Sequence, residues 1–185
     1  MLNSVINFED FNDEVSPGIF RKFRYALWLL TSNIFFLTNI PYPNKFKVLI
    51  LKLFGGEIGN KVVIKPWVKI KFPWLLTLGN AVWLGESVWI DNISEIKIGD
   101  NVCISQGALL ITGNHNYSSK LFELNSKPIK IEDGVWICAK TIVIGGVTIH
   151  SHAVLAINSM ASCDLPSYSI YSGNPAIFIK NRIIE

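Results

Sequence analysis

Large aliphatic residues recur every six positions through most of this chain. The repeating positions fall into five triplets: Ile58, Ile64, Ile70; Leu78, Leu84, Ile90; Ile98, Ile104, Leu110; Ile131, Ile137, Val143; and Ile149, Leu155, Ala161. An α-helix repeats near 3.6 residues and a half-buried strand near 2, so neither explains a period of six. Three short strands per coil, stacked as a parallel β-solenoid, do explain it.

A second register of small or β-branched residues follows four positions after the first two members of each triplet, and also four positions after Val143. It comprises Val62, Val68, Val82, Val88, Val102, Ala108, Val135, Thr141, Val147, Ala153 and Ser159. We expect the large aliphatic residues to point into a narrow bore and the small ones to lie near corners. Gly often follows the aliphatic residue, as at Gly59 and Gly79, and we expect it to take strained backbone conformations there.

One corner of the predicted coil accepts insertions. The steps from Ile70 to Leu78 and from Ile90 to Ile98 are eight residues long, and Leu110 to Ile131 repeats the same corner with a long insertion. A loop at 111–130 therefore leaves from a fixed edge of a rigid scaffold, which is a common way to position chemistry. This insertion contains His115, one of only three histidines.

Composition excludes some classes of protein. Hydrophobic residues make up 50% of the chain and charged residues 17%, which indicates a well-packed domain, and a net charge of +3 is too small to indicate a nucleic-acid partner. Cys103, Cys138 and Cys163 show no paired spacing, so we expect reduced and mostly buried thiols.

The N-terminal part contains an apolar stretch. The first ten residues are polar and acidic, so we expect no signal peptide. The stretch 25–40 is too short and too polar to span a bilayer, and Arg21, Lys22 and Arg24 precede it. A helix capping the core and a helix lying on an anionic membrane surface both fit this pattern.

The repeated [Ile/Leu/Val]-Gly-x-x-x-x pattern resembles the hexapeptide-repeat acyltransferases over about residues 58–185. Within that superfamily the ordered segments "LKLFGGEIG", "IKPWVKIKFPWLLTLG", "TGNHNYSS" and "GNPA" resemble sugar O-acetyltransferases of the colanic-acid and exopolysaccharide type. Galactoside and maltose acetyltransferases are more distantly similar. The resemblance implies a mainly β, left-handed parallel β-helix of about five coils. Its expected parts are a helical cap at 1–55, the β-helix at 56–165, and a donor-site tail at 166–185.

The resemblance also implies an activity. Acetyl would move from acetyl-CoA, without a metal, to a hydroxyl of a sugar or lipid-linked saccharide during exopolysaccharide assembly. The enzyme would act in the cytoplasm as a homotrimer with sites between subunits. A lipid-linked acceptor would give the stretch 25–40, if it lies on a surface, a peripheral contact with the inner membrane face. Three alternatives stay open: N-acetylation of an amino sugar, a non-catalytic scaffold, and a zinc hydratase that uses His150 and His152 together with His115.

Candidate site residues follow from the same pattern. A hydroxyl is a poor nucleophile at neutral pH and needs a base, and the resemblance assigns this role to His115. Polar side chains near this position in the predicted coils give the candidate acceptor-binding residues, which are Asp91, Asn92, Asn114 and Tyr117.

The resemblance assigns the donor site to the last coils and the tail. The matching positions are Ala139 in "VWICAK", Ile157 in "LAINSM", Gly173 and Asn174 in "YSGNPA", and Lys180 and Arg182 beyond them. The chain departs from the family pattern at Cys138 and Asn158, where Gly is usual, and at Cys163, where Lys is usual.

Overall fold

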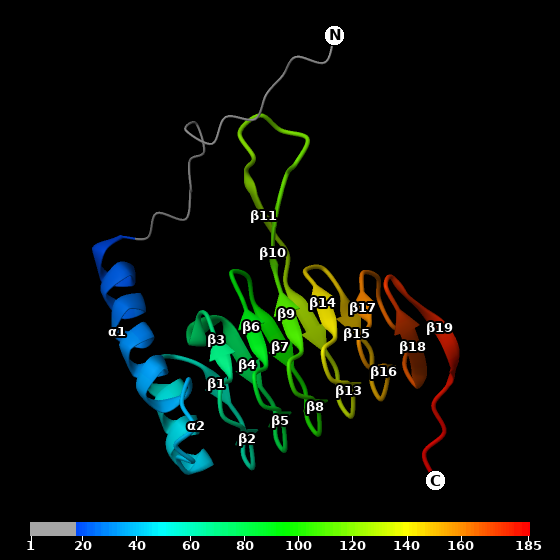
Figure 1. Cartoon of the computed structure of the whole chain (residues 1–185), viewed down its shortest axis with the longest axis horizontal. Helices are drawn as coiled ribbons and strands as arrows, with labels where there is room; N and C mark the ends of the chain where they lie inside the picture. Colours follow the sequence, from blue (N-terminus) through cyan, green and yellow to red (C-terminus); the bar gives the residue numbers. More distant parts are fainter. Residues whose placement is uncertain (1–17) are drawn as a thin grey trace.

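A computed structural model describes residues 18–185 and shows a β-solenoid with two helices at its N-terminal end (Figure 1). The helices are α1 (Ile19–Phe35) and α2 (Asn44–Leu53). The expectation about a signal peptide concerns residues outside the described part. Among residues 18–185, no helix is long and apolar enough to cross a membrane.

Three parallel sheets form the walls of the solenoid. The first contains β1 (Glu57–Ile58), β4 (Leu76–Leu78), β7 (Ile96–Ile98), β12 (Ile129–Ile131) and β15 (Thr148–Ile149). The second contains β2 (Val63–Ile64), β5 (Trp83–Leu84), β8 (Cys103–Ile104), β13 (Trp136–Ile137), β16 (Val154–Leu155), β18 (Ser169–Gly173) and β19 (Ala176–Asn181). The third contains β3 (Lys69–Ile70), β6 (Trp89–Asp91), β9 (Leu109–Ile111), β14 (Ile142–Ile144) and β17 (Met160–Ala161).

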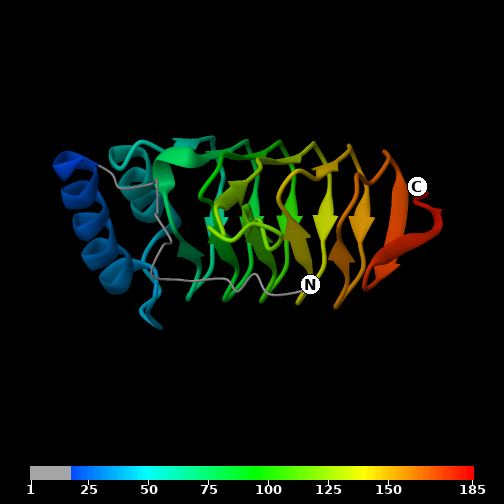
Figure 2. The same cartoon turned by 90° about the horizontal axis from the view of Figure 1, so that it is seen from above.

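The coils stack in register along one axis (Figure 2). Each strand pairs in parallel with the strand one coil away, as Ile90 pairs with Leu110 between β6 and β9. Five coils are complete, and Leu165 bridges to Ile149 to begin a partial sixth. The predicted parallel β-helix of about five coils is therefore confirmed.

The bore of the solenoid is filled by the residues of the two sequence registers. Every residue of the five triplets is buried, from Ile58 with 6% of its surface exposed to Ala161 with none. All members of the second register are buried as well. Each coil alone would expose this apolar surface, so the fold is stabilised by the stacking of its neighbours.

The corners correct one expectation about glycine. Gly59 and Gly79 do not take left-handed backbone; a Cβ at Gly59 would lie 2.5 Å from the carbonyl oxygen of Gly79 in the next coil. Glycine is needed there because the coils approach closely. Left-handed backbone occurs instead just before the small buried residue, for example at Lys61 (φ 55°) and Asn158 (φ 57°).

Polar side chains also link successive coils between the first and second sheets. The backbone N–H of Asn60 donates to Oδ1 of Asn80, that of Asn80 to Oδ1 of Asp100, and that of Asp100 to Oδ1 of Asp133. These bonds satisfy backbone donors that the short strands leave unpaired at the corner.

The two helices close the first coil. Trp28 of α1 is fully buried, and its indole N–H donates to the carbonyl oxygen of Ile70 at 2.8 Å. Lys47 of α2 is also buried and donates to the carbonyl oxygen of Ile64, and burial lowers the pKa of its amine. The inner faces of both helices therefore pack on the first coil of the solenoid.

Candidate active site

The long insertion projects from the edge between the third and first sheets (Figure 1). It runs between β9 and β12 and contains a short antiparallel hairpin of β10 (Gly113–His115) and β11 (Leu124–Ser126). The hairpin holds His115 opposite Leu124. The expected loop at the insertion corner is thus present, with the candidate base in its stem.

The ring of His115 is held by the far side of its own loop. Its Nδ1 atom lies 2.9 Å from the carbonyl oxygen of Phe122, and the two rings stack with centroids 4.3 Å apart. A carbonyl oxygen only accepts hydrogen bonds, so Nδ1 of the neutral ring carries the proton there. The lone pair that can accept a proton is therefore on Nε2.

The base of the insertion is fixed by buried contacts. Thr112 is buried, and its hydroxyl accepts hydrogen bonds from the backbone N–H groups of Ile93 and Ser94. A Cβ at Gly145 would lie 2.7 Å from the carbonyl oxygen of Thr112 and 2.8 Å from that of Lys127. Glycine at 145 therefore lets both ends of the insertion pass close to the next coil.

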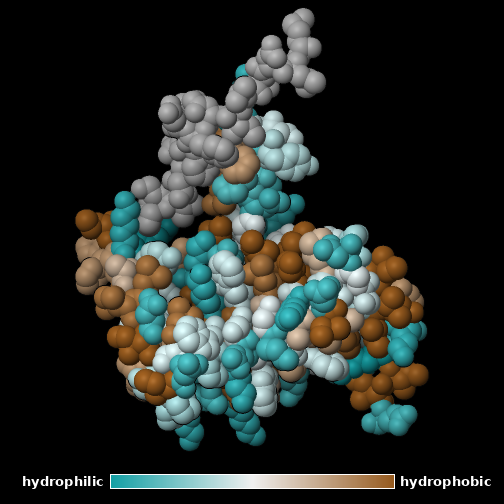
Figure 3. Space-filling model, in the orientation of Figure 1, coloured by the Kyte–Doolittle hydropathy of each residue, from teal (hydrophilic) through white to brown (hydrophobic). Residues whose placement is uncertain are grey.

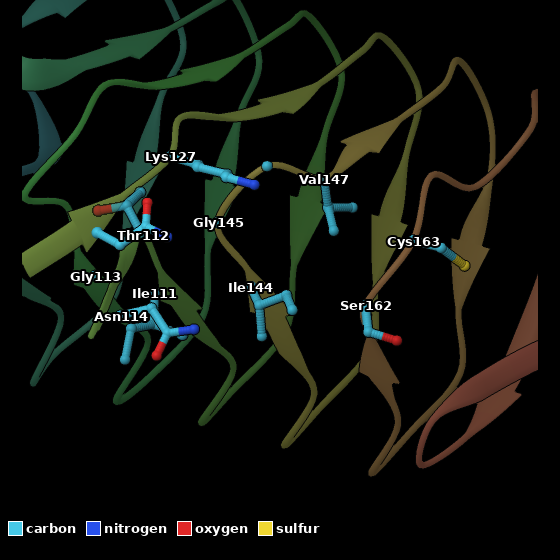
Figure 4. Close-up of a pocket in the computed structure, with 12 residues that line it drawn as sticks. Ile111, Thr112, Gly113, Asn114, Lys127, Ile144, Gly145, Val147, Ser162 and Cys163 are labelled. Atoms are coloured by element: carbon cyan, nitrogen blue, oxygen red, sulfur yellow. The ribbon is translucent and has the colours of Figure 1, made fainter. Parts of the chain in front are cut away.

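A pocket of about 560 Å³ lies beside the base of the insertion, where the loop leaves the solenoid (Figure 4). Its walls come from the stem of the insertion, the corner after β14 and the corner after β17, and include Asn114, Asn125, Lys127 and Cys163. Asn114 reaches it from the stem, so one predicted acceptor residue lines a cavity. His115 is not among the lining residues.

The other predicted acceptor residues lie in three different settings. Asp91 is 16% exposed, forms an ion pair of 2.9 Å with Lys71, and lines a smaller pocket of about 220 Å³ between α1 and the third sheet. Tyr117 is 80% exposed in the outer part of the insertion. Asn92 is fully buried, and its amide bonds the backbone N–H and carbonyl of Phe72.

Asn92 therefore corrects an expectation. An amide with no exposed surface cannot contact a sugar, and both of its polar atoms already serve the corner of the neighbouring coil. An Asp-Asn pair after a strand is typical of a turn as well as of a sugar-binding site. The side chain of Asn92 stabilises a turn.

Four predicted donor residues gather at another edge, between the second and third sheets. The backbone N–H of Asn158, next to Ile157, donates to the carbonyl oxygen of Ala139 at 3.0 Å. The N–H of Gly173 donates to Oγ of Ser159 at 2.9 Å. Ala139, Ile157, Gly173 and Asn174 thus lie at one corner in successive coils, with Ile157 exposed.

The two predicted basic donor residues lie at the opposite end of the tail hairpin. Lys180 pairs with Ile170 in the register of β18 and β19, whereas Gly173 pairs with Ala176 at the turn. Arg182 donates from Nη1 to the carbonyl oxygens of Gly134 and His152, both at 3.0 Å. These bonds fasten the tail to the corner between the first and second sheets, so Arg182 has a structural role.

The three histidines do not converge. His150 and His152 lie in a corner after β15, where His150 is 3.3 Å from Glu132 and His152 stacks on Tyr168, whereas His115 is on the insertion. No group of three His, Cys, Asp or Glu side chains in residues 18–185 could hold a metal ion. The zinc hydratase alternative therefore has no site in the part of the chain that the structure describes.

The cysteines are more accessible than expected. Cys103 and Cys138 are partly exposed, and Cys163 is exposed; all three are free thiols. Burial raises the pKa of the Cys138 thiol, so this group stays protonated at neutral pH and is not an activated nucleophile.

No motif in the sequence indicated Phe122, Thr112 or Lys127 as functional residues. Phe122 supplies both the carbonyl and the ring that hold His115, but no spacing rule links two residues across an irregular loop. The pair Gly145-Gly146, at a corner without insertion, was a signal that another segment passes close to this corner; that segment is the base of the loop, at Thr112 and Lys127.

Known proteins share both the sequence and the fold. A protein of Escherichia coli (strain K12) named as a colanic acid biosynthesis acetyltransferase is 37% identical over 160 residues, which cover 86% of this chain and 88% of that protein. This chain belongs to the hexapeptide-repeat acetyltransferases. No family model matches it.

Two further comparisons support this acetyltransferase assignment. The galactoside O-acetyltransferase of Escherichia coli (strain K12) is 28% identical over 148 residues, covering 77% of this chain and 72% of that protein. A hexapeptide-repeat acetyltransferase from Vibrio cholerae O1 biovar eltor, crystallised with acetyl coenzyme A, superimposes with a TM-score of 0.80 at 26% identity and covers 93% of each chain. The family, the fold and the acetyltransferase class that the sequence predicted are confirmed.

Proposed function

We propose that this acetyltransferase moves acetyl from acetyl-CoA to a hydroxyl of a sugar or saccharide precursor, with His115 as the general base. The observation that carries the proposal is the contact between His115 Nδ1 and the Phe122 carbonyl oxygen, which directs the basic lone pair to Nε2. Relatives named for colanic acid biosynthesis and galactoside O-acetylation support the sugar hydroxyl, and the acetyl-CoA complex of a structural relative supports the donor.

The reaction proceeds by direct attack. Nε2 of His115 removes the hydroxyl proton as the oxygen adds to the thioester carbonyl, giving a tetrahedral intermediate. Collapse of this intermediate breaks the carbon–sulfur bond, and the imidazolium returns the proton to the departing thiolate of CoA. The protonated state of Cys138 is consistent with a mechanism that has no acyl-enzyme intermediate.

The acceptor is proposed to lie near the stem of the insertion. Asn114 lines the pocket there and Tyr117 is exposed farther out, so both can donate to or accept from sugar hydroxyls. Asp91 lines the smaller pocket beside α1, one coil below, and is proposed to contact a more distant part of a longer acceptor. The process we propose is assembly of an exopolysaccharide in the cytoplasm.

The active site is proposed to form between subunits of a homotrimer. His115 and the donor row of Ala139, Ile157 and Gly173 lie at different edges of one chain, so a second chain brings them together. The outer face of the second sheet offers a contact surface because it carries Trp83 and Trp136, which are 46% and 45% exposed.

Each segment of the chain then has its own proposed role. Residues 18–55 form the described part of the proposed cap, the solenoid with its insertion carries the acceptor side, and the tail from residue 166 completes the donor side. Lys180, exposed near the far end of β19, is proposed to meet the phosphates of CoA.

Replacement of the base tests the proposal. His115→Ala is expected to lower turnover of candidate sugars 10²- to 10⁴-fold while the affinity for CoA, measured by calorimetry, stays unchanged. His150→Ala is the matched control and is expected to keep wild-type turnover. Equal turnover in His115→Ala and wild type would remove His115 from the mechanism, and faster acetylation of amino sugars than of sugar hydroxyls would favour N-acetylation.

A further inference from the structure

The outer faces of the two N-terminal helices are apolar, and none of the other residues between 18 and 185 covers them. On α1 the exposed side chains recur at three- and four-residue intervals: Phe20, Phe23, Leu27, Leu30 and Ile34 are 88%, 70%, 47%, 66% and 55% exposed. On α2 the same spacing brings out Phe46, Leu49 and Leu53. We call these eight residues the apolar stripes. A spacing of three and four places such residues on one face of a helix.

The inner faces of the same helices already pack on the solenoid. Trp28 and Phe36 are fully buried, and Trp28 contacts Phe54 and Phe36 edge to face. α1 is therefore apolar on both faces, a pattern typical of helices that are buried or that contact lipid. A capping role explains the inner face and leaves the apolar stripes without a function.

The described part of the cap is cationic. Residues 18–56 contain six Lys and Arg and no Asp or Glu. Lys47 is buried and Arg24 lies over the Trp74 ring at 4.2 Å, so four cations remain exposed: Arg21, Lys22, Lys45 and Lys52. In contrast, residues 57–185 contain nearly equal numbers of basic and acidic side chains.

The apolar stripes lie where they could contact a flat surface such as a membrane. Both helices lie at the N-terminal end of the solenoid, where the surface is predominantly apolar (Figures 1 and 3). Since no helix in residues 18–185 can cross a bilayer, insertion of the stripes would be parallel to a surface. In a trimer with parallel solenoid axes the three caps would face the same side, which would multiply a weak contact.

We infer that the cap docks this acetyltransferase on a membrane surface rich in anionic lipid, with the apolar stripes in the headgroup region and the four exposed cations on the lipid phosphates. The charge of residues 18–56 favours a membrane over a second copy of the chain as the partner of this face. Four exposed cations with no acid between residues 18 and 56 would repel the same face of a second copy, whereas they attract an anionic bilayer. This inference rests on the cap alone and does not depend on acetyl transfer.

Vesicle sedimentation of the full-length protein tests the inference. We expect binding to vesicles with 30% phosphatidylglycerol in phosphatidylcholine to exceed binding to pure phosphatidylcholine by about tenfold or more, and to weaken as salt rises. The full chain is used because residues 1–17, outside the described part, carry four acids that act on the same measurement.

Paired variants separate the two contributions. Phe23→Ser with Leu30→Ser is expected to lower vesicle binding about tenfold or more, and Arg21→Gln with Lys22→Gln is expected to lower it and flatten its salt dependence. The matched controls are Ile177→Ser with Ile183→Ser, and Lys97→Gln with Lys130→Gln; these residues are exposed on other parts of the molecule and should leave binding unchanged.

Several results would overturn the inference. Absence of wild-type binding to anionic vesicles would do so, as would loss of binding in the control variants equal to the loss in the stripe variants. A smaller molar mass of the stripe variant in light scattering, without any vesicle binding by wild type, would assign the stripes to a second copy of the chain. Turnover of a soluble acceptor by the Phe23/Leu30 and Arg21/Lys22 variants is measured in parallel and should be unchanged, so failure of docking and failure of the proposed activity are distinguishable.

Discussion

The Nδ1 atom of His115 lies 2.9 Å from the carbonyl oxygen of Phe122, seven residues later in the same loop. The contact fixes both the tautomer and the direction of the imidazole, and the Phe122 ring stacked on it at 4.3 Å limits its rotation. A base that is held in this way still needs a donor site to act on.

Phe122→Ala tests the contribution of the stacked ring. The variant keeps the backbone carbonyl but removes the surface that restrains the imidazole, so turnover should fall about 10- to 100-fold. Leu121→Ala, next to it and 51% exposed, is the control and should keep turnover. The measurement is steady-state kinetics at saturating acetyl-CoA; equal rates in both variants would show that the Phe122 ring does not position the base.

Mixed trimers test whether the site forms between chains. His115→Ala lacks the base, and Ile157→Glu places a charge on the exposed donor edge, so each variant alone should be inactive. If each site takes its base from one chain and its donor edge from another, random mixing in equal amounts should restore about a quarter of wild-type activity. Co-expression with two affinity tags isolates the mixed species, in which one site of three is intact, so about a third of wild-type activity is expected.

No recovery in the mixed trimers would contradict a shared site. The control is His115→Ala co-expressed under both tags, in which every chain lacks the base and no arrangement of chains can restore a site. Light scattering of each variant shows whether the assembly itself has survived.

The fold could be predicted from the sequence because every inward position has the same requirement. Ile90 and Leu110 stack directly on each other in a bore that admits large aliphatic side chains, so each coil repeats the signal. The corners carried a weaker signal. Gly59 suggested strained backbone, but the residue with left-handed backbone is Lys61. Glycine is favoured both by strained backbone and by close approach of two coils, so the pattern alone could not tell which of the two applies at Gly59.

The site could be predicted only where a motif names one residue. The loop histidine and its edge followed from the spacing, but the partners of His115 did not, because they depend on the path of an irregular loop. Asn92 was misassigned because a turn and a sugar site use the same residue types. The spacing of Arg182 from Asn174 does not reveal the hairpin that carries Arg182 to another edge, where it bonds backbone carbonyls.

Gly59→Ala tests the close approach of stacked corners. The added Cβ would meet backbone atoms of Gly79 and Asn80 at 2.5 to 2.9 Å, and backbone cannot move aside as a flexible side chain can. We expect the free energy of unfolding to fall by about 2 kcal/mol or more. Lys61→Ala, two residues later and exposed, should change it by less than about 0.5 kcal/mol. Urea unfolding followed by circular dichroism measures both, and similar midpoints for the two variants would argue against close packing at this corner.

Glu132→Gln tests an electrostatic contribution of the fourth coil. Lys130 lies 2.9 Å from one carboxylate oxygen, and its hydrogen bond is the main reason that the pKa of Glu132 falls from 4.5 to about 2; the N–H and hydroxyl of Ser151 bond the other oxygen, and His150 faces it at 3.3 Å. A carboxyl with a lowered pKa in the folded state stabilises the protein above its unfolded pKa, and this stabilisation is lost as pH falls toward the folded pKa. The difference in unfolding free energy between wild type and Glu132→Gln should therefore be constant near neutral pH, at up to about 1 kcal/mol because solvent screens the group. It should then shrink between pH 4.5 and about 2.

Glu95→Gln is the control for this prediction. It removes a more exposed carboxylate from its pair with Lys97 and should show a smaller difference throughout. Chemical denaturation at a series of pH values measures both, and a Glu132→Gln difference that stays unchanged down to pH 3 would mean that lost packing, not lost charge, causes it.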